Sequence, residues 1–264
     1  MRNRKIILTS IFIALSLIKI QGQILEGRII DSLTGEPLEY VSIGIIDTPF
    51  GSITDDAGYF SFEAKGQDAS SRVRISMIAY KAKIFTMEDL SSIDKEIKLI
   101  QTAYELAEVV VKPRASERKA GSSGFNILSG WSGWGGMHIR KGYEMGTRIE
   151  LGDQPVKLKN LHVRLHRQAF DTSFYRLHIR AMRDTLILEE LLTQNIIVSI
   201  SEESGWALID LESYKLVLSG EVGVTLEWLK VDGVNKDRAM KINKRMQGAY
   251  ILFKNQKNVC GLYR

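Results

Sequence analysis

Residues 27–62 read GRIIDSLTGEPLEYVSIGIIDTPFGSITDDAGYFSF, and their pattern indicates the fold of the first half of the chain. Short runs of β-branched and aromatic residues alternate in it with clusters of Gly, Pro, Asp, Ser and Thr. Residues 38–45 alternate apolar with small or polar side chains, which is typical of a half-buried strand. Residues 55–58, Asp-Asp-Ala-Gly, predict a tight hairpin loop in which Gly58 takes a positive φ. The stretch therefore predicts short strands joined by turns.

The same pattern continues on both sides of this stretch. About seven strand candidates with hardly any helix signal predict a β-sandwich. The candidates are residues 23–30, 38–45, 52–54, 59–62, 73–80, 95–99 and 104–111.

The order of these motifs resembles the carboxypeptidase-like regulatory domain. Residues 76–80, Ser-Met-Ile-Ala-Tyr, stand where that family has an S-x-x-G-Y strand, with Ala79 in place of glycine. The resemblance covers residues 24–111 and implies a prealbumin-like (transthyretin-like) sandwich, a module found on peptidases, outer-membrane transporters and surface proteins. The other quoted motifs are GRIID (27–31), GEPL (35–38), VSI (41–43) and TDDAGYF (54–60).

Residues 104–111, YELAEVVV, resemble the L-x-E-V-V-V segment that closes this module in TonB-dependent outer-membrane transporters. A final sandwich strand is the favoured interpretation. The alternative is a contact with envelope partners, as in an accessory relative of TonB-dependent systems. Its candidate partner-binding residues are Leu106, Glu108, Val109, Val110 and Val111.

Residues 112–136 are rich in Gly and Ser and predict a linker. Trp131 and Trp134 are unusual in such a setting. Their flat rings are candidates for stacking on the sugar rings of a glycan. They could equally dock the linker onto a domain as hydrophobic plugs, because tryptophan buries a large area, and we favour docking.

Residues 137–264 predict a second, jelly-roll-like β-sandwich, and whether it closes within the chain stays open. The motifs LLTQNIIV, GWALIDL and VTLEWL resemble a C-terminal sandwich that follows the first module in secreted proteins of Gram-negative bacteria. Residues 236–246 read as basic loop or helix. His162 and His166 lie about 13 Å apart along one strand, so we expect a surface rather than a shared metal ion. The expected strands are residues 157–166, 175–180, 188–198, 205–211 and 222–229.

Residues 1–23 predict a cleaved signal peptide, with a basic start, an apolar core over 6–18 and small Gly22 near the cut. The alternative, a membrane anchor, needs roughly 20 apolar residues. Removing the four basic residues of this segment lowers the formal net charge from +5 to +1. We expect export to the periplasm, the outer-membrane periphery or the exterior, with no transmembrane span after cleavage and no nucleic-acid partner. Residues 230–264 hold nine Lys or Arg and two Asp, a basic tail that is either solvated or in contact with an acidic surface.

No motif for catalysis, for metal binding or for a cofactor stands out. None of the four histidines has a glutamate three residues later, and the chain holds no G-x-S-x-G elbow and no P-loop. The single cysteine, Cys260, excludes an intrachain disulfide. We therefore predict a non-catalytic binding or scaffolding protein whose partner is a glycan or an envelope protein. A hydrolase with a site assembled from distant loops is a further alternative.

Overall fold

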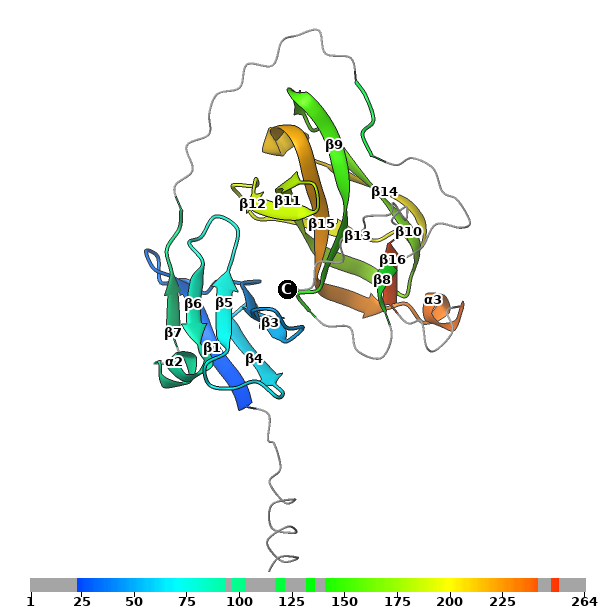
Figure 1. The fold of residues 1–264 in the computed structure, drawn as a ribbon. Helices are drawn as coiled ribbons and strands as arrows, with labels where there is room; N and C mark the ends of the chain where they lie inside the picture. The colour runs from blue at the N-terminus through cyan, green and yellow to red at the C-terminus, as the bar shows by residue number, and fades with distance from the viewer. Residues whose placement is uncertain are drawn as a thin grey trace, which may run out of the picture.

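The computed structural model describes residues 23–93, 96–102, 117–121, 132–135, 141–241 and 248–251. Strands dominate these residues and form two units that lie side by side (Figure 1). The prediction of an all-β fold is confirmed. Within the described ranges, no helix has the length and hydrophobicity needed to cross a membrane.

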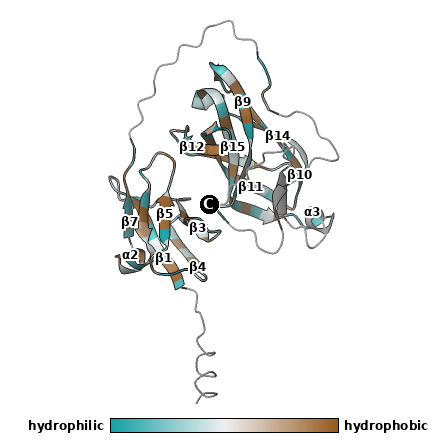
Figure 2. Ribbon diagram, in the orientation of Figure 1, coloured by the Kyte–Doolittle hydropathy of each residue, from teal (hydrophilic) through white to brown (hydrophobic). Residues whose placement is uncertain are grey.

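The first unit is a sandwich of two sheets. One sheet has the strand order β4-β1-β7, with β7 parallel to β1, and the other has the order β3-β2-β5-β6. Hydrophobic and hydrophilic residues alternate along the strands (Figure 2), and the inward residues of both sheets form one core. The strands are β1 (Gln23–Asp31), β2 (Ser42–Ile45), β3 (Gly51–Ile53), β4 (Tyr59–Ala64), β5 (Arg72–Ser76), β6 (Lys83–Thr86) and β7 (Glu96–Leu99).

The strand expected over residues 38–45 begins only at Ser42. The chain turns at Tyr40, whose φ of 63° lies in the left-handed region. Buried Thr54 holds this turn, because its hydroxyl donates to the carbonyl of Leu38 (2.6 Å) and accepts from the amide of Val41 (2.8 Å). Side-chain hydrogen bonds to the backbone thus override the alternating pattern.

The loop at residues 55–58 is a tight turn but not a hairpin within one sheet. Gly58 has a φ of 78°, as predicted, and Asp55 Oδ1 accepts hydrogen bonds from the amides of Ala57 and Tyr59. However, β3 and β4 belong to different sheets, so the turn carries the chain across the sandwich. The sequence pattern also misses β6, which has no buried residue, and the six-residue helix α2 (Met87–Ser92).

The second unit also contains two sheets, with the strand orders β14-β10-β16-β8 and β12-β11-β15-β9, and β13 also pairs with β11. Of the segment expected to be a linker, Ser132–Gly135 forms an edge strand of this unit. The region expected as one strand over residues 188–198 is divided between two strands. The strands are β8 (Ser132–Gly135), β9 (Glu144–Lys157), β10 (Asn160–Gln168), β11 (Phe170–Arg183), β12 (Leu186–Glu190), β13 (Ile196–Ile200), β14 (Gly205–Asp210), β15 (Val217–Val234) and β16 (Gly248–Ile251).

A core of apolar residues lies between the two sheets of the second unit. Tyr175 and Trp228 meet edge to face in it, with their ring centroids 5.4 Å apart. A single 3-10 turn, η1 (Glu212–Tyr214), precedes β15, and the helix α3 (Lys236–Lys241) follows it within the region read as basic loop or helix.

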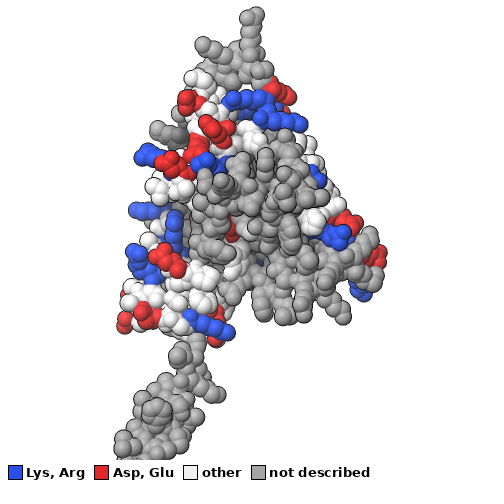
Figure 3. All heavy atoms as spheres, turned by 45° about the vertical axis from the view of Figure 1, so that its right-hand side comes forward, with Lys and Arg blue, Asp and Glu red and all other residues white. Residues whose placement is uncertain are grey.

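The two units also share a small apolar contact. Tyr40 and Ile53 of the first unit are buried with Leu229 of β15, and Phe174 and Ile197 pack against them. Elsewhere, basic and acidic side chains are interspersed over the described part of the face in Figure 3. At the junction, polar side chains of the second unit, among them Arg176, are buried.

Candidate binding site at the junction of the two units

Three polar side chains on one face of β11 are buried, and the first of them reaches the first unit. Arg176, His178 and Arg180 point to one face of the sheet because side chains two residues apart along a strand share a face. Their exposed fractions are only 1%, 2% and 5%. Their neighbours on β15, Thr225 and Glu227, are buried as well. A buried group of this kind must find its charge and hydrogen-bond partners within the protein.

Arg176 joins the two units directly. Its Nη1 donates to Glu227 (3.0 Å) and to the hydroxyl of Ser42 on β2 (3.1 Å), and its Nη2 donates to the carbonyl of Tyr40. Its Nε donates to Asn195 (2.9 Å). The left-handed turn at Tyr40 thus presents a carbonyl oxygen to a guanidinium of the other unit.

His178 lies between two carboxylates. Its Nδ1 is 2.7 Å from Glu190 Oε2, and its Nε2 is 2.9 Å from Glu227 Oε2. An ionised carboxylate only accepts hydrogen bonds, and a neutral imidazole donates through one nitrogen. A neutral imidazole and two ionised carboxylates have one N–H to donate, which is enough for one of these bonds. Both bonds can form at once only if His178, Glu190 and Glu227 share one additional proton.

Arg180 forms a second ion pair beside the first. Its two Nη atoms contact the two oxygens of Glu144, and Thr225 donates a hydrogen bond to the same carboxylate. Although burial opposes the charge of Arg180, the adjacent Glu144 and Glu190 carboxylates raise its pKa above the ordinary value. Bidentate arginine–carboxylate pairs are among the stronger polar contacts in proteins.

We call Arg176, His178, Arg180, Glu144, Glu190 and Glu227 the junction cluster. Two guanidinium groups and the imidazole of His178 face three carboxylates in it. All six residues belong to the second unit, and Arg176 and Glu227 link them to the first unit through Ser42 and the carbonyl of Tyr40.

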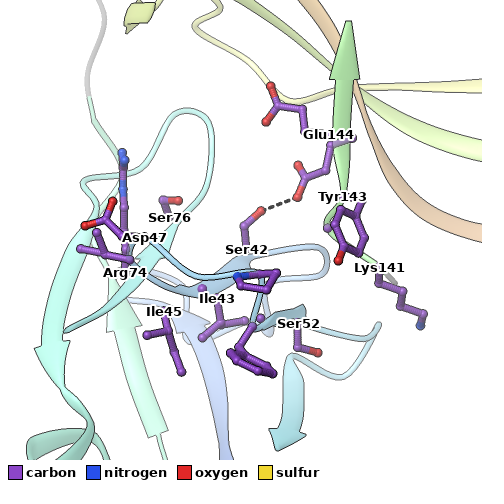
Figure 4. A pocket seen from close by; sticks show the side chains of 17 residues that line it. Ser42, Ile43, Ile45, Asp47, Ser52, Arg74, Ser76, Lys141, Tyr143 and Glu144 are labelled. Atoms are coloured by element: carbon purple, nitrogen blue, oxygen red, sulfur yellow. Dashed lines mark hydrogen bonds between the residues drawn. The ribbon is translucent and has the colours of Figure 1, made fainter. Parts of the chain in front are cut away.

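A pocket of about 230 Å³ opens next to the junction cluster, between the outer face of the β3-β2-β5-β6 sheet and residues 141–144. Figure 4 shows Asp47, Arg74 and Ser76 on one side of it and Lys141 and Tyr143 on the other. The bond that Ser42 donates to Glu227 (2.7 Å, dashed) connects the pocket with the cluster.

Gly142 brings the second unit up to the pocket. It has a φ of 84°, a backbone conformation that favours glycine, and its amide donates to the carbonyl of Trp228 (2.8 Å). A Cβ at this position would lie 3.8 Å from Glu227 Oε1 and 3.5 Å from Ile53. The tight turn therefore places Lys141 and Tyr143 against the first unit.

The binding residues predicted from the sequence are elsewhere. Trp131 lies outside the described residues, as do Leu106, Glu108, Val109, Val110 and Val111. Trp134 belongs to β8, where its backbone pairs with Ala249 of β16. The roles predicted for these residues stay predictions.

The surface predicted for β10 is confirmed, because His162 and His166 are both exposed. Sequence reasoning missed the junction cluster. The sequence nevertheless contains a signal for this cluster, because Glu227 is a lone carboxylate in the otherwise uncharged run of residues 222–229, VGVTLEWL. A charge in the middle of a buried strand requires a partner, and the alternating Arg and His residues of 175–180 supply it.

Comparison with protein families gives a match over residues 25–111, to the CarboxypepD_reg-like domain. The matched range begins at the third residue of β1, contains β2 to β7 and extends through the segment 104–111. No curated protein matches the chain. The sandwich built by β1 to β7 is thus a carboxypeptidase regulatory-like domain, as its turn and strand motifs indicate.

Proposed function

We propose that this protein is an exported, non-catalytic module of the cell envelope or cell surface that binds a glycan or an envelope protein. The observation that carries the proposal is the junction cluster. Its members Arg176 and Glu227 bond to Ser42 and Tyr40 of the first sandwich, and a pocket lies at this boundary.

The chemistry of the cluster supports binding rather than turnover. A general base or acid must reach a proton on a substrate. Glu227 instead accepts from Arg176 and Ser42 and contacts His178, and Glu144 is enclosed by Arg180 and Thr225. The carboxypeptidase regulatory-like domain fits the same role, since the domain is an accessory module in the family it resembles.

Export rests on residues 1–23, with their basic start and apolar core. Fractionation of the native host, with N-terminal sequencing of the protein, tests it. We expect a mature chain that begins close to Ile24 in the envelope or extracellular fraction. A full-length chain in the cytoplasm would contradict export.

Binding is tested with the purified mature chain on a glycan array and by photo-crosslinking in the envelope. We expect capture of a glycan or of one envelope protein, and no turnover of a panel of glycosides and peptides. Turnover that is lost in Glu227→Gln would show that the cluster is catalytic and would refute the proposal. Crosslinks from Val109 to a TonB-dependent transporter would instead favour the accessory role predicted from residues 104–111.

A further inference from the structure

We propose that the junction pocket binds one ring of an uncharged sugar, at the end or within the chain of a glycan. This inference rests on the proposed binding function and names the ligand and its site. Four properties of the pocket support it, namely its size, its hydroxyl groups, its aromatic rings and its charge.

The size of the pocket limits the ligand to one small group. Its volume is about 230 Å³. Pockets that enclose drug-sized ligands measure about 300–1,000 Å³. A single sugar ring is of the right order, whereas a long stretch of glycan or peptide would extend beyond the pocket over its open rim.

Three serine hydroxyl groups line the pocket, those of Ser42, Ser52 and Ser76, and all three residues are half-buried. A serine hydroxyl has one proton and two lone pairs. Ser42 donates its proton to Glu227 and accepts from Arg176, so the cluster fixes its orientation and leaves a second lone pair for a ligand. Hydroxyls that donate and accept match a ligand that carries many hydroxyls of its own.

Two aromatic rings add an apolar surface to this polar lining. Phe50 comes from the turn after β2 and Tyr143 from the segment before β9, and both are half-buried. The C–H face of a sugar ring packs well on such rings, while its hydroxyls reach the polar groups around them. Gly44 on β2 keeps the floor of the pocket open, since no atom comes closer than 3.9 Å to where its Cβ would be.

The charges around the pocket have no dominant sign. Asp47, Arg74 and Lys141 are exposed at its rim. The two deeper carboxylates, Glu144 and Glu227, are paired with arginines of the junction cluster. A lining of mixed charge favours an uncharged polar ligand over a uronic acid or a basic side chain of a protein.

The test blocks the pocket without touching the cluster. In Gly44→Val, a β-branched side chain that suits a strand would project from the outer face of β2 into the pocket. Ser61→Val is the matched control, because it adds a similar side chain at an exposed strand position in the other sheet of the same unit. Thermal unfolding of both variants shows that each still folds.

The probes are neutral oligosaccharides of glucose, galactose and mannose, with oligogalacturonate as the acidic comparison, in calorimetric titrations of the mature chain. We expect at least one neutral oligosaccharide to bind and oligogalacturonate to bind more weakly. Gly44→Val should weaken binding at least tenfold, Ser76→Ala a few-fold, and Ser61→Val should not change it.

Three results would overturn the inference. Unchanged binding in Gly44→Val would move the site elsewhere, and loss of binding in Trp131→Ala or Trp134→Ala would then place it on the segment predicted from the sequence. Preference for oligogalacturonate would contradict the uncharged ligand. Absence of all glycan binding, with a crosslinked envelope protein that Gly44→Val releases, would assign the pocket to a protein side chain. In that case the binding function itself would stand.

Discussion

Replacing Arg176 with methionine tests the junction cluster most directly. Methionine keeps the unbranched apolar stem but removes the guanidinium, which is 1% exposed and donates to two backbone or side-chain groups of the other unit. The substitution leaves the buried carboxylate of Glu227 without its ion-pair partner at 3.0 Å. Loss of one partner of a buried ion pair costs about 3–5 kcal/mol. We expect a loss in this range, towards its lower end, because His178 and Ser42 still contact Glu227.

Urea denaturation followed by tryptophan fluorescence measures this free energy, since Trp228 lies on the same strand as Glu227. The double variant Arg176→Met with Glu227→Gln should recover part of the loss, to about 1–2 kcal/mol, because it removes the uncompensated charge. Arg148→Met is the matched control. Arg148 pairs with Glu221 at 2.9 Å near the surface, with side chains 31% and 25% exposed, and such pairs contribute about 0–1 kcal/mol.

Equal losses of stability in Arg176→Met and Arg148→Met would contradict this expectation. A double variant less stable than Arg176→Met alone would contradict it as well. Either result would mean that the cluster is not the buried, tightly coupled link between the units that its geometry indicates.

Three further predictions concern the first unit. The pKa of Asp31 is lowered by the hydrogen bond from Tyr80 and, to a smaller extent, by the bonds from the backbone amides of Thr34 and Leu33. The ionised Asp31 therefore stabilises the fold above the pKa that this group has in the unfolded chain, and this stabilisation is lost as the pH falls. Asp31→Asn should therefore lower the melting temperature at pH 7, and its difference from wild type should shrink steadily below about pH 4; a constant difference down to pH 2 would contradict this. In urea titrations, Gly58→Ala should lower the free energy of unfolding more than Gly35→Ala does, by roughly 1–3 kcal/mol. Both glycines have a positive φ, but only at Gly58 would a Cβ lie 2.5 Å from a carbonyl oxygen. Equal losses in the two variants would refute this. Thr54→Val should cost about 2–3 kcal/mol in the same assay, because it leaves a buried amide and a carbonyl without their hydroxyl partner; a loss below about 0.5 kcal/mol would show that neither bond matters.

Much of the fold follows from local pattern in the sequence. Strand β1 could be predicted from the alternation of its side chains. The turn at Gly58 could be predicted because glycine readily adopts a positive φ. The turn at Tyr40 could not be predicted, since the hydroxyl of Thr54 that fixes it comes from the residue after β3, 16 positions from Leu38. Strand β6 was missed because none of its four residues is buried, so its sequence does not alternate between buried and exposed side chains.

The candidate site was harder to predict for a different reason. The alternation of residues 175–180 places Arg176 and His178 on one face correctly, but it does not say whether solvent or another unit covers that face. Only the three-dimensional arrangement brings Ser42 within reach of Arg176, across 134 positions of sequence. The pocket depends on the same long-range contact, so no local motif marks it.

The dependence of the pocket on both units has a further consequence. Its floor and hydroxyls belong to the carboxypeptidase regulatory-like domain, but one ring and one ammonium, those of Tyr143 and Lys141, come from the second unit. In a separated second unit, Arg176 and Glu227 would lose the bonds that they make to Ser42 and Tyr40. A pocket of this composition therefore exists only while the two units are in contact. Binding and the union of the two units are then coupled, so a ligand that occupies the pocket should also raise the stability of the whole chain.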